Sequence, residues 1–461
     1  MSGYEYILLI IFIIAAFISY KNIVFALILL IITSCTFGFI SDFLNIPLAL
    51  GSISINDFII FSLFIWTIGN VKLQKGDNLY SLILFLIFWI CLSSILAFIT
   101  YQITIREVYR SIFKISLFWI LPITVRSLKF VQTKKIISFL IVLTAIISIV
   151  QVYAILFADV RVLSIIYPTP EAEYFRYSSL EKYFLDIYNR NEMPRLYTPG
   201  NLLVKIVFGF LLSLIFFRNK EYKLMYILPV LFLTGLFNIT LGGRSDSLFI
   251  LFVVLLSTFI SYFLYKNTKV IFSNNIKNIF LIANVLILGF ILLSNMFPRT
   301  ITLLADRWSI IFYQLNSSNI RIEDTIEAWD RLIASPLWGI GRTKVHWEAK
   351  YGTYGGQDVH PFISQGLLSG FVGIILLLFL IYLIVKQTAK KIRNFRRTVD
   401  HINTFYLSAG VGILGAIMLS VINTTPVFFY APVQVPLGIF IGILFSKQKK
   451  IINENINVFP E

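Results

Sequence analysis

The feature that most constrains this chain is a series of apolar runs long enough to cross a bilayer as helices. A helix needs about 20 apolar residues to span the hydrocarbon core. We expect thirteen spans, at about 4–20, 22–40, 56–70, 79–99, 107–125, 136–158, 199–217, 224–241, 245–264, 278–297, 361–385, 403–423 and 427–446. The expected fold class is all-α: a polytopic transmembrane helical bundle of about 12–13 spans with a large, partly helical outer loop.

The net charge of +16 is distributed unevenly, which predicts topology rather than nucleic-acid binding. One set of connections holds 22 Lys+Arg and 5 Asp+Glu, whereas the rest of the chain holds 17 and 18. That set comprises the whole connections between spans that hold Lys21, Lys72 and Lys75, Arg126 to Lys135, Arg218 to Lys223, Lys266 to Lys277, and Lys386 to Arg397, and the tail from Lys447. Basic residues collect on the cytoplasmic side, so the C-terminus is expected there. Thirteen spans place the N-terminus outside. A miscount of the spans in 4–40, or a re-entrant piece in 41–57, would place the N-terminus inside, so the side of the N-terminus stays open.

Two long outer connections divide the chain. The expected regions are N-terminal spans (1–158), a first long outer loop (159–198), central spans (199–297), a large outer loop (298–360), and closing spans with a basic cytoplasmic loop and tail (361–461). Loops of this length usually carry function. In the second, Ile322, Ile326, Trp329 and Leu332 or Ile333 recur at helical spacing before Pro336. This pattern predicts an amphipathic helix on the outer face of the membrane.

Charged residues at membrane depth are costly and therefore mark candidate sites. Arg106, Arg110 and Lys114 are spaced four apart and are expected on one helix face. There they can hold the phosphates of a lipid-linked substrate. The alternative is a set of snorkelling side chains with an Arg110–Glu107 pair.

Other cations stand at the edges of spans. Arg244, in "TLGGRSDSLF", lies at a tight break before a helix start, which suits an anion, unless it pairs with Asp246 in an outer hairpin. Arg195 lies just before the seventh span and is a phosphate contact or an interface anchor. Lys205 lies inside that span and needs a partner or a water-filled cavity.

The large outer loop contributes Arg307, Arg321, His346 and His360. Histidine is the side chain best suited to exchange a proton near neutral pH. His360 stands directly before a long span, so it is a candidate base, or else an interfacial histidine that caps the span.

Motifs of soluble chemistry are absent from the sequence. It has no nucleotide-binding loop and no zinc-ligand spacing. Glu171 and Glu173 alone do not complete a cation shell, and Cys35 and Cys91 lie in apolar runs. We expect no metal, no cofactor, no disulfide framework and no nucleic-acid partner.

Three segments together resemble a known family. They are "LGGRSDSLF", "NIRIEDTIEAWDRLIASPLWGIGRT" and "DVHPFISQGLLSGFVGIILLL". They resemble the arginine element, the Arg–Trp–Pro–Gly–Gly stretch and the His–Gly element of the bacterial O-antigen ligases and O-antigen, capsule or exopolysaccharide polymerases. The matching residues are Arg244, Arg321, Trp329, Pro336, Gly339, Gly341, His360 and Gly370. Two positions depart from the family: Pro361 replaces a common Asn, and Gly243 replaces a small hydroxyl residue.

The resemblance implies a metal-independent glycosyltransferase on the outer face of a bacterial cytoplasmic membrane. Its donor is a glycan on undecaprenyl pyrophosphate, and its acceptor glycan sits on a second lipid-linked repeat or on a lipid A core. Arg244 and Arg321 would neutralise the pyrophosphate, and His360 would orient or deprotonate the acceptor hydroxyl. The expected substrate-binding residues are Arg106, Arg110, Lys114, Arg195, Lys205, Arg307 and His346. Membrane lipids, a chain-length regulator and a flippase are the other expected partners.

Polymerase is favoured over ligase because the loop at 159–198 offers a second basic surface for a growing chain. Its cations are Arg161, Arg176, Arg190 and Arg195. From another class, a transporter or flippase for lipid-linked sugars predicts two related halves and polar residues along the spans. The sequence shows neither feature.

Overall fold

The structure is a computed structural model. It describes residues 3–36, 44–48, 51–71, 77–101, 103–157, 159–166, 180–189, 200–217, 222–240, 244–265, short stretches between 284 and 303, 319–340, 361–397, 401–423 and 431–446. Six of the described helices are long and apolar enough to cross a membrane, and six shorter apolar helices accompany them. The predicted all-α polytopic bundle is therefore confirmed. Most of the expected span at 278–297 lies outside the described residues.

The N-terminal helices follow the expected runs closely. They are α1 (Gly3–Lys21), α2 (Ile23–Cys35), α4 (Ile55–Asn70), α5 (Asn78–Tyr101), α6 (Ile105–Ser111), η1 (Ile112–Ser116), η2 (Leu117–Ile120), α7 (Leu121–Arg126) and α8 (Phe130–Leu156). The elements from α6 to α7 together form one span. Asn22 alone joins α1 to α2, and its side-chain oxygen accepts a hydrogen bond from the Phe25 N–H (3.1 Å), so it caps the second helix.

The remaining helices include those of the two long outer loops. They are α9 (Val160–Ile166), α10 (Leu180–Asn189), α11 (Asn201–Phe216), α12 (Leu224–Thr240), α13 (Arg244–Tyr265), α16 (Asn319–Ala334), α18 (Pro361–Arg397), α19 (His401–Asn423) and α20 (Ala431–Phe445). The amphipathic pattern in the large loop indeed forms a helix, α16, which ends just before Pro336.

A short β-hairpin occupies part of the stretch at 41–57 for which a re-entrant piece was considered. Strand β1 (Asn45–Leu48) pairs antiparallel with β2 (Gly51–Ser54). Helix α4 begins directly after it, at Ile55. The described part of this stretch is therefore a hairpin that leads into a span.

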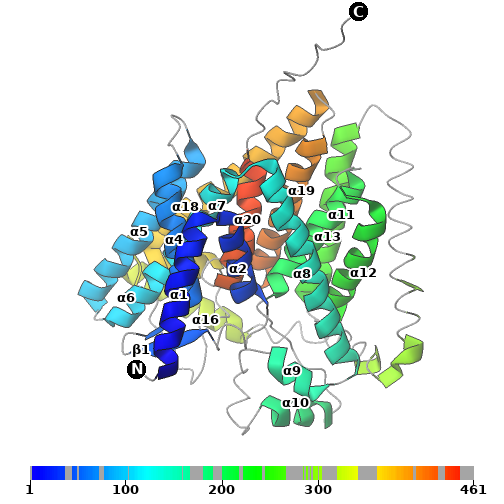
Figure 1. Ribbon diagram of the computed structural model, residues 1–461, viewed down its shortest axis with the longest axis horizontal. Coiled ribbons are helices and arrows are strands. Elements are labelled where there is room, and N and C mark those ends of the chain that lie inside the picture. Colours follow the sequence, from blue (N-terminus) through cyan, green and yellow to red (C-terminus); the bar gives the residue numbers. More distant parts are fainter. Residues whose placement is uncertain are drawn as a thin grey trace, which may run out of the picture.

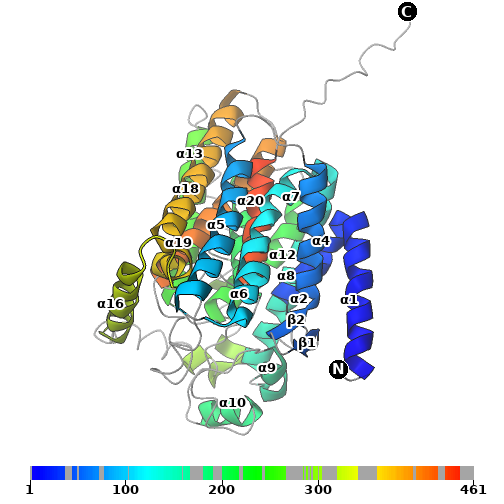
Figure 2. The same ribbon diagram turned by 90° about the vertical axis from the view of Figure 1, so that its left-hand side faces the viewer.

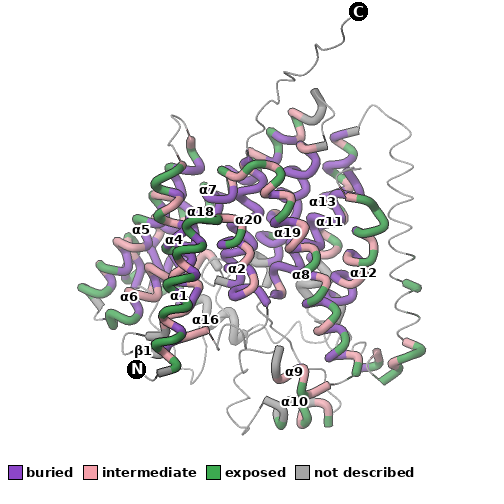
Figure 3. Tube along the Cα trace, in the orientation of Figure 1, coloured by how far each residue is buried: buried purple, intermediate pink, exposed green. Residues whose placement is uncertain are grey.

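The centre of the bundle is formed by α11, α19 and α20, which are buried along their described lengths (Figure 3). Small residues let these helices approach closely. A Cβ added to Gly209 of α11 would lie 3.1 Å from the Cα of Gly412 on α19. Gly438 and Gly442 of α20 likewise face α7. The closing helices thus pack between the central and the N-terminal spans.

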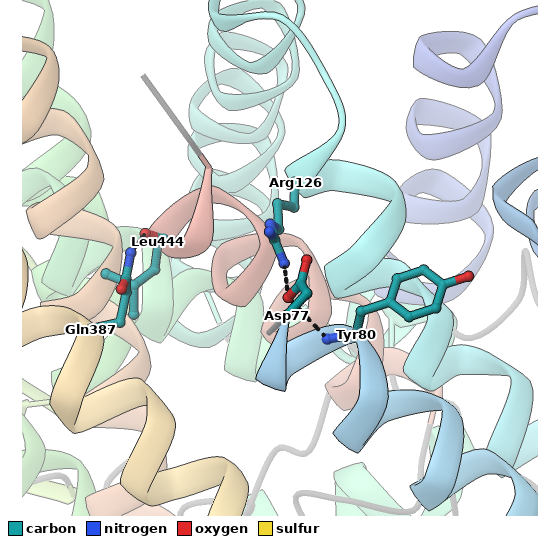
Figure 4. A network of polar contacts seen from close by, with 5 residues as sticks. All are labelled: Asp77, Tyr80, Arg126, Gln387 and Leu444. Carbon is teal, nitrogen blue, oxygen red and sulfur yellow. Dashed lines mark hydrogen bonds and ion pairs between the residues drawn. The ribbon is translucent and has the colours of Figure 1, made fainter. Parts of the chain in front are cut away.

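The two ends of the bundle differ. Helix α1 starts at the end where α9, α10 and α16 lie, whereas α20 finishes at the opposite end (Figures 1 and 2). At that opposite end, Arg126 Nη1 contacts Asp77 Oδ1 (2.5 Å) and Gln387 donates to the Leu444 carbonyl (3.5 Å), as Figure 4 shows. The basic run at the end of α18 begins there too. This arrangement agrees with an odd number of spans.

Candidate functional site

A buried carboxylate meets the predicted cationic face of the fifth span, defined as Arg106, Arg110 and Lys114. Asp57, near the start of α4, is only 5% exposed. Its Oδ2 accepts hydrogen bonds from the Ser54 N–H (2.8 Å) and the Tyr109 hydroxyl (3.2 Å). Lys114 Nζ lies 3.7 Å from the same oxygen. One carboxylate therefore ties the innermost cation of the face to α4.

An irregular turn brings Lys114 to this carboxylate. In η1 the Leu117 N–H donates to the Ile112 carbonyl, five residues back, which is a π-helical bond. Such π turns are rare and often occur at functional sites. The Gln434 side chain on α20 donates to the Ile115 carbonyl (3.1 Å), so a neighbouring helix holds the distorted turn in place.

The cationic face keeps an excess of positive charge. Arg106 and Arg110 are near enough to Lys114 for their charges to act on it. The Glu107 carboxylate accepts a hydrogen bond from the Thr104 N–H (2.9 Å) at the start of α6. Arg106 is exposed and Arg110 half-buried. Together these groups can attract a phosphate-bearing ligand at the outer end of the span.

A second assembly joins the large outer loop to α18. We call it the glycine junction, because Gly339 of the loop and Gly370 of α18 define it. Both adopt positive φ, +74° and +68°. A Cβ on Gly370 would collide with the Leu337 carbonyl, and one on Gly339 would collide with backbone oxygens of α18. Only glycine fits these two positions.

The glycine junction fills a break in α18. Ser369 and Gly370 depart from helical geometry, which leaves backbone groups of the helix without their usual partners. The Ile340 N–H donates to the Leu367 carbonyl (2.9 Å), and the Phe371 N–H donates to the Pro336 carbonyl (2.8 Å). The loop thus supplies the hydrogen bonds that the break removes.

Trp89 connects this break to α5. Its indole N–H donates to the Ser369 carbonyl (2.8 Å). Helix α5 also packs against α6 and η1, which carry the cationic face. The two assemblies are therefore linked through one helix.

The bases of the two long outer loops also touch. Phe157, after α8, packs edge-on against Phe297, with ring centroids 5.0 Å apart. Arg299 donates to the Tyr188 carbonyl on α10 (3.4 Å). Burial raises the pKa of the Tyr188 hydroxyl above its usual range. These two contacts connect the residues around 297–299 with α10 and with the end of α8.

The other predicted site residues fall into three groups. Lys205 is buried, as predicted, near the start of α11 (7% exposed). Arg244 is the first residue of α13, and Arg321 lies in the first turn of α16. For both residues the structure describes the backbone only. Four residues lie outside the described part of the chain: Arg195, Arg307, His346 and His360.

No protein-family model and no curated protein matches this chain. The assignment of a function therefore depends on the site itself and on the resemblance of its motifs.

Sequence reasoning missed Asp57, Tyr109 and Trp89. A signal for Asp57 was present, because Ser54 and Asp57 have the spacing of a capping box before an apolar run. No comparable pattern marks Tyr109 or Trp89, whose partners lie far away in the sequence.

Proposed function

We propose that this chain is a membrane glycosyltransferase that polymerises lipid-linked repeat units into a surface polysaccharide. The donor is an oligosaccharide on undecaprenyl pyrophosphate, and the reaction takes place on the outer face of a bacterial cytoplasmic membrane. The observation that supports this most is the glycine junction, because it packs two of the three family-like motifs directly against each other.

The proposed catalytic residues lie on helices that pack against α18 or directly before α18 itself. Arg321 is on α16, which packs against α18, and His360 directly precedes α18. Arg244 opens α13, which also packs against α18. In the proposal the two arginines neutralise the leaving pyrophosphate. His360 deprotonates the acceptor hydroxyl as it attacks the anomeric carbon, with inversion.

The cationic face suits a separate task in the same reaction. It lies on a span, so it can contact a phosphate whose polyprenyl tail stays in the lipid. Arg106 is the member best placed for this because its side chain is exposed, whereas Lys114 is engaged with Asp57. Lys114 thus contributes long-range attraction rather than direct contact.

The test is reconstitution of the purified protein in liposomes with a lipid-linked repeat unit, with and without EDTA. Wild-type protein should produce longer glycans in both conditions. His360→Ala should reduce elongation by at least about 100-fold, the size of a lost general base. His401→Ala is the matched control, because α19 begins with this histidine at the other end of the bundle.

The outcomes separate the alternatives. Full elongation by His360→Ala would remove this histidine from the mechanism. Transfer to a lipid A core acceptor, without elongation, would instead identify a ligase. Movement of the lipid-linked sugar across the bilayer, with no new glycosidic bond, would identify a transporter.

A further inference from the structure

The depth of α16 in the bilayer can be inferred from its contacts, independently of the proposed function. The residues that follow α16 bond to backbone groups inside a span. Ile340 reaches the Leu367 carbonyl, and the Pro336 carbonyl accepts from Phe371. The C-terminal end of α16 therefore lies at the same depth as residues 367–371 of α18.

Two helices measure that depth from the opposite end of the bundle, where Figure 4 draws both Asp77 and Gln387. Along α18, Gly370 precedes Lys386 by sixteen residues, which is about 24 Å at 1.5 Å per residue. Trp89 of α5 donates to the Ser369 carbonyl at the break. It lies twelve residues after Asp77 in the sequence, which is about 18 Å along a helix. A usual tilt of about 20° shortens both by less than a tenth.

We take the charged groups of Asp77 and Lys386 as the cytoplasmic edge of the hydrocarbon core, which is about 30 Å thick. Measured from that edge, both lengths end inside the core and pass its midpoint, which puts the break in α18 in the outer leaflet. The end of α16 that is bonded to this break then lies there too. Figure 2 shows α16 alongside the outer part of α18.

The surface of α16 suits that position. Ala328 and Leu332 are buried, in one cluster with Leu367 of α18. The apolar face of α16 lies beside this buried side and consists of Ile326, Trp329 and Ile333 of the helix and Leu337 of the turn that follows it. Each of these side chains is more than two-fifths exposed, and they recur at helical spacing.

The neighbouring surface of α18 is equally apolar. Beyond the break, Ile375, Leu378, Phe379 and Tyr382 are exposed, as far as the described residues show, on a candidate membrane span, whose exposed side chains are expected to face lipid tails.

We propose that the C-terminal half of α16 is inserted in the outer leaflet, with its apolar face against the acyl chains of bilayer lipids. The large outer loop is thus anchored within the membrane and does not lie on its surface. The partner is the hydrocarbon of ordinary phospholipids.

Spin labelling tests this placement in the full-length protein. Single cysteines replace Ile333 or Leu337 after Cys35 and Cys91 are changed to alanine, and the labelled protein is placed in phosphatidylcholine–phosphatidylglycerol vesicles. Collision rates are measured with oxygen, which concentrates in lipid, and with a water-soluble nickel chelate. Ile375→Cys on α18 is the lipid reference and Asp330→Cys on α16 the polar reference, because both positions are exposed.

The expected result is an oxygen-to-nickel ratio at positions 333 and 337 equal to that at 375 and higher than that at 330. A ratio equal to that at 330 would overturn the proposal by placing the helix in water. Low collision rates with both reagents would also overturn it, because another protein surface would then cover the face.

A second measurement needs no cysteine replacement. Ile333→Lys should lower the thermal midpoint in lipid nanodiscs by more than Asp330→Lys does, because only the first places a charge in hydrocarbon. Equal midpoints for the two variants would contradict the insertion.

Discussion

Asp57 and Lys114 form an ion pair that connects two apolar helices. Both lie on apolar helices, and their charges meet across fifty-seven residues of sequence. The capping spacing of Ser54 and Asp57 predicts a helix start but not a partner on another helix. This contact depends on the π turn of η1, which no sequence pattern marks.

The pair should behave as a coupled unit. Asp57→Asn keeps the shape but removes the charge beside a largely buried ammonium, so we expect the free energy of unfolding to fall by about 1–3 kcal/mol. Lys114→Gln should cost a similar amount. The double variant should be more stable than the sum of the two losses predicts, by about 1–3 kcal/mol.

The measurement is a double-mutant cycle on thermal midpoints in detergent. Asp330→Asn, an exposed carboxylate on another helix, is the control and should change little. Strict additivity of the two losses would show that Asp57 and Lys114 do not act on each other.

At the scale of helices and strands, the apolar runs predicted most spans to within a few residues. The runs at 56–70 and 79–99 correspond to α4 and α5. The helix of the outer loop was also predictable, because Ile326 and Trp329 belong to one periodic pattern. The β-hairpin was not, since Pro47 and Gly51 interrupt any alternating pattern. The break in α18 was hidden because glycines inside a span are common, and Gly366 and Gly373 of the same helix cause no break.

The glycine junction makes its own prediction. Gly370→Ala introduces a side chain at φ +68° that also collides with the loop, so α16 should separate from α18. We expect the free energy of unfolding to fall by at least about 2 kcal/mol and trypsin to cut after Arg331 faster. Gly69→Ala is the control, since an added Cβ there meets nothing within 4 Å. Unchanged cleavage in Gly370→Ala would contradict the role given to the junction.

For the whole molecule, the bias of basic residues and the direction of the helices agree on one topology. The side of the N-terminus was not decidable from the sequence, because the runs between 4 and 57 allowed more than one count. The structure places the start of α1 with α9, α10 and α16 (Figures 1 and 2). How the helices pack around α11 was equally beyond the sequence, since nearly all its residues are apolar.

This topology can be tested with fusions. Green fluorescent protein joined after residue 461 should fluoresce in bacterial cells, because the C-terminus is expected in the cytoplasm. Alkaline phosphatase joined after residue 340 should be active, because that position is expected outside. A fluorescent-protein fusion that does not fluoresce, together with an inactive phosphatase fusion, would show that the protein has the opposite orientation.

The central position of α20 has a consequence for biogenesis. Translation delivers this helix after the other described helices, yet α2, α7, α11 and α19 all pack against it. The earlier helices therefore enter the bilayer before their common neighbour exists, and their packing is complete only when α20 has been made. A chain that ends before Ala431 lacks the helix against which these four helices pack.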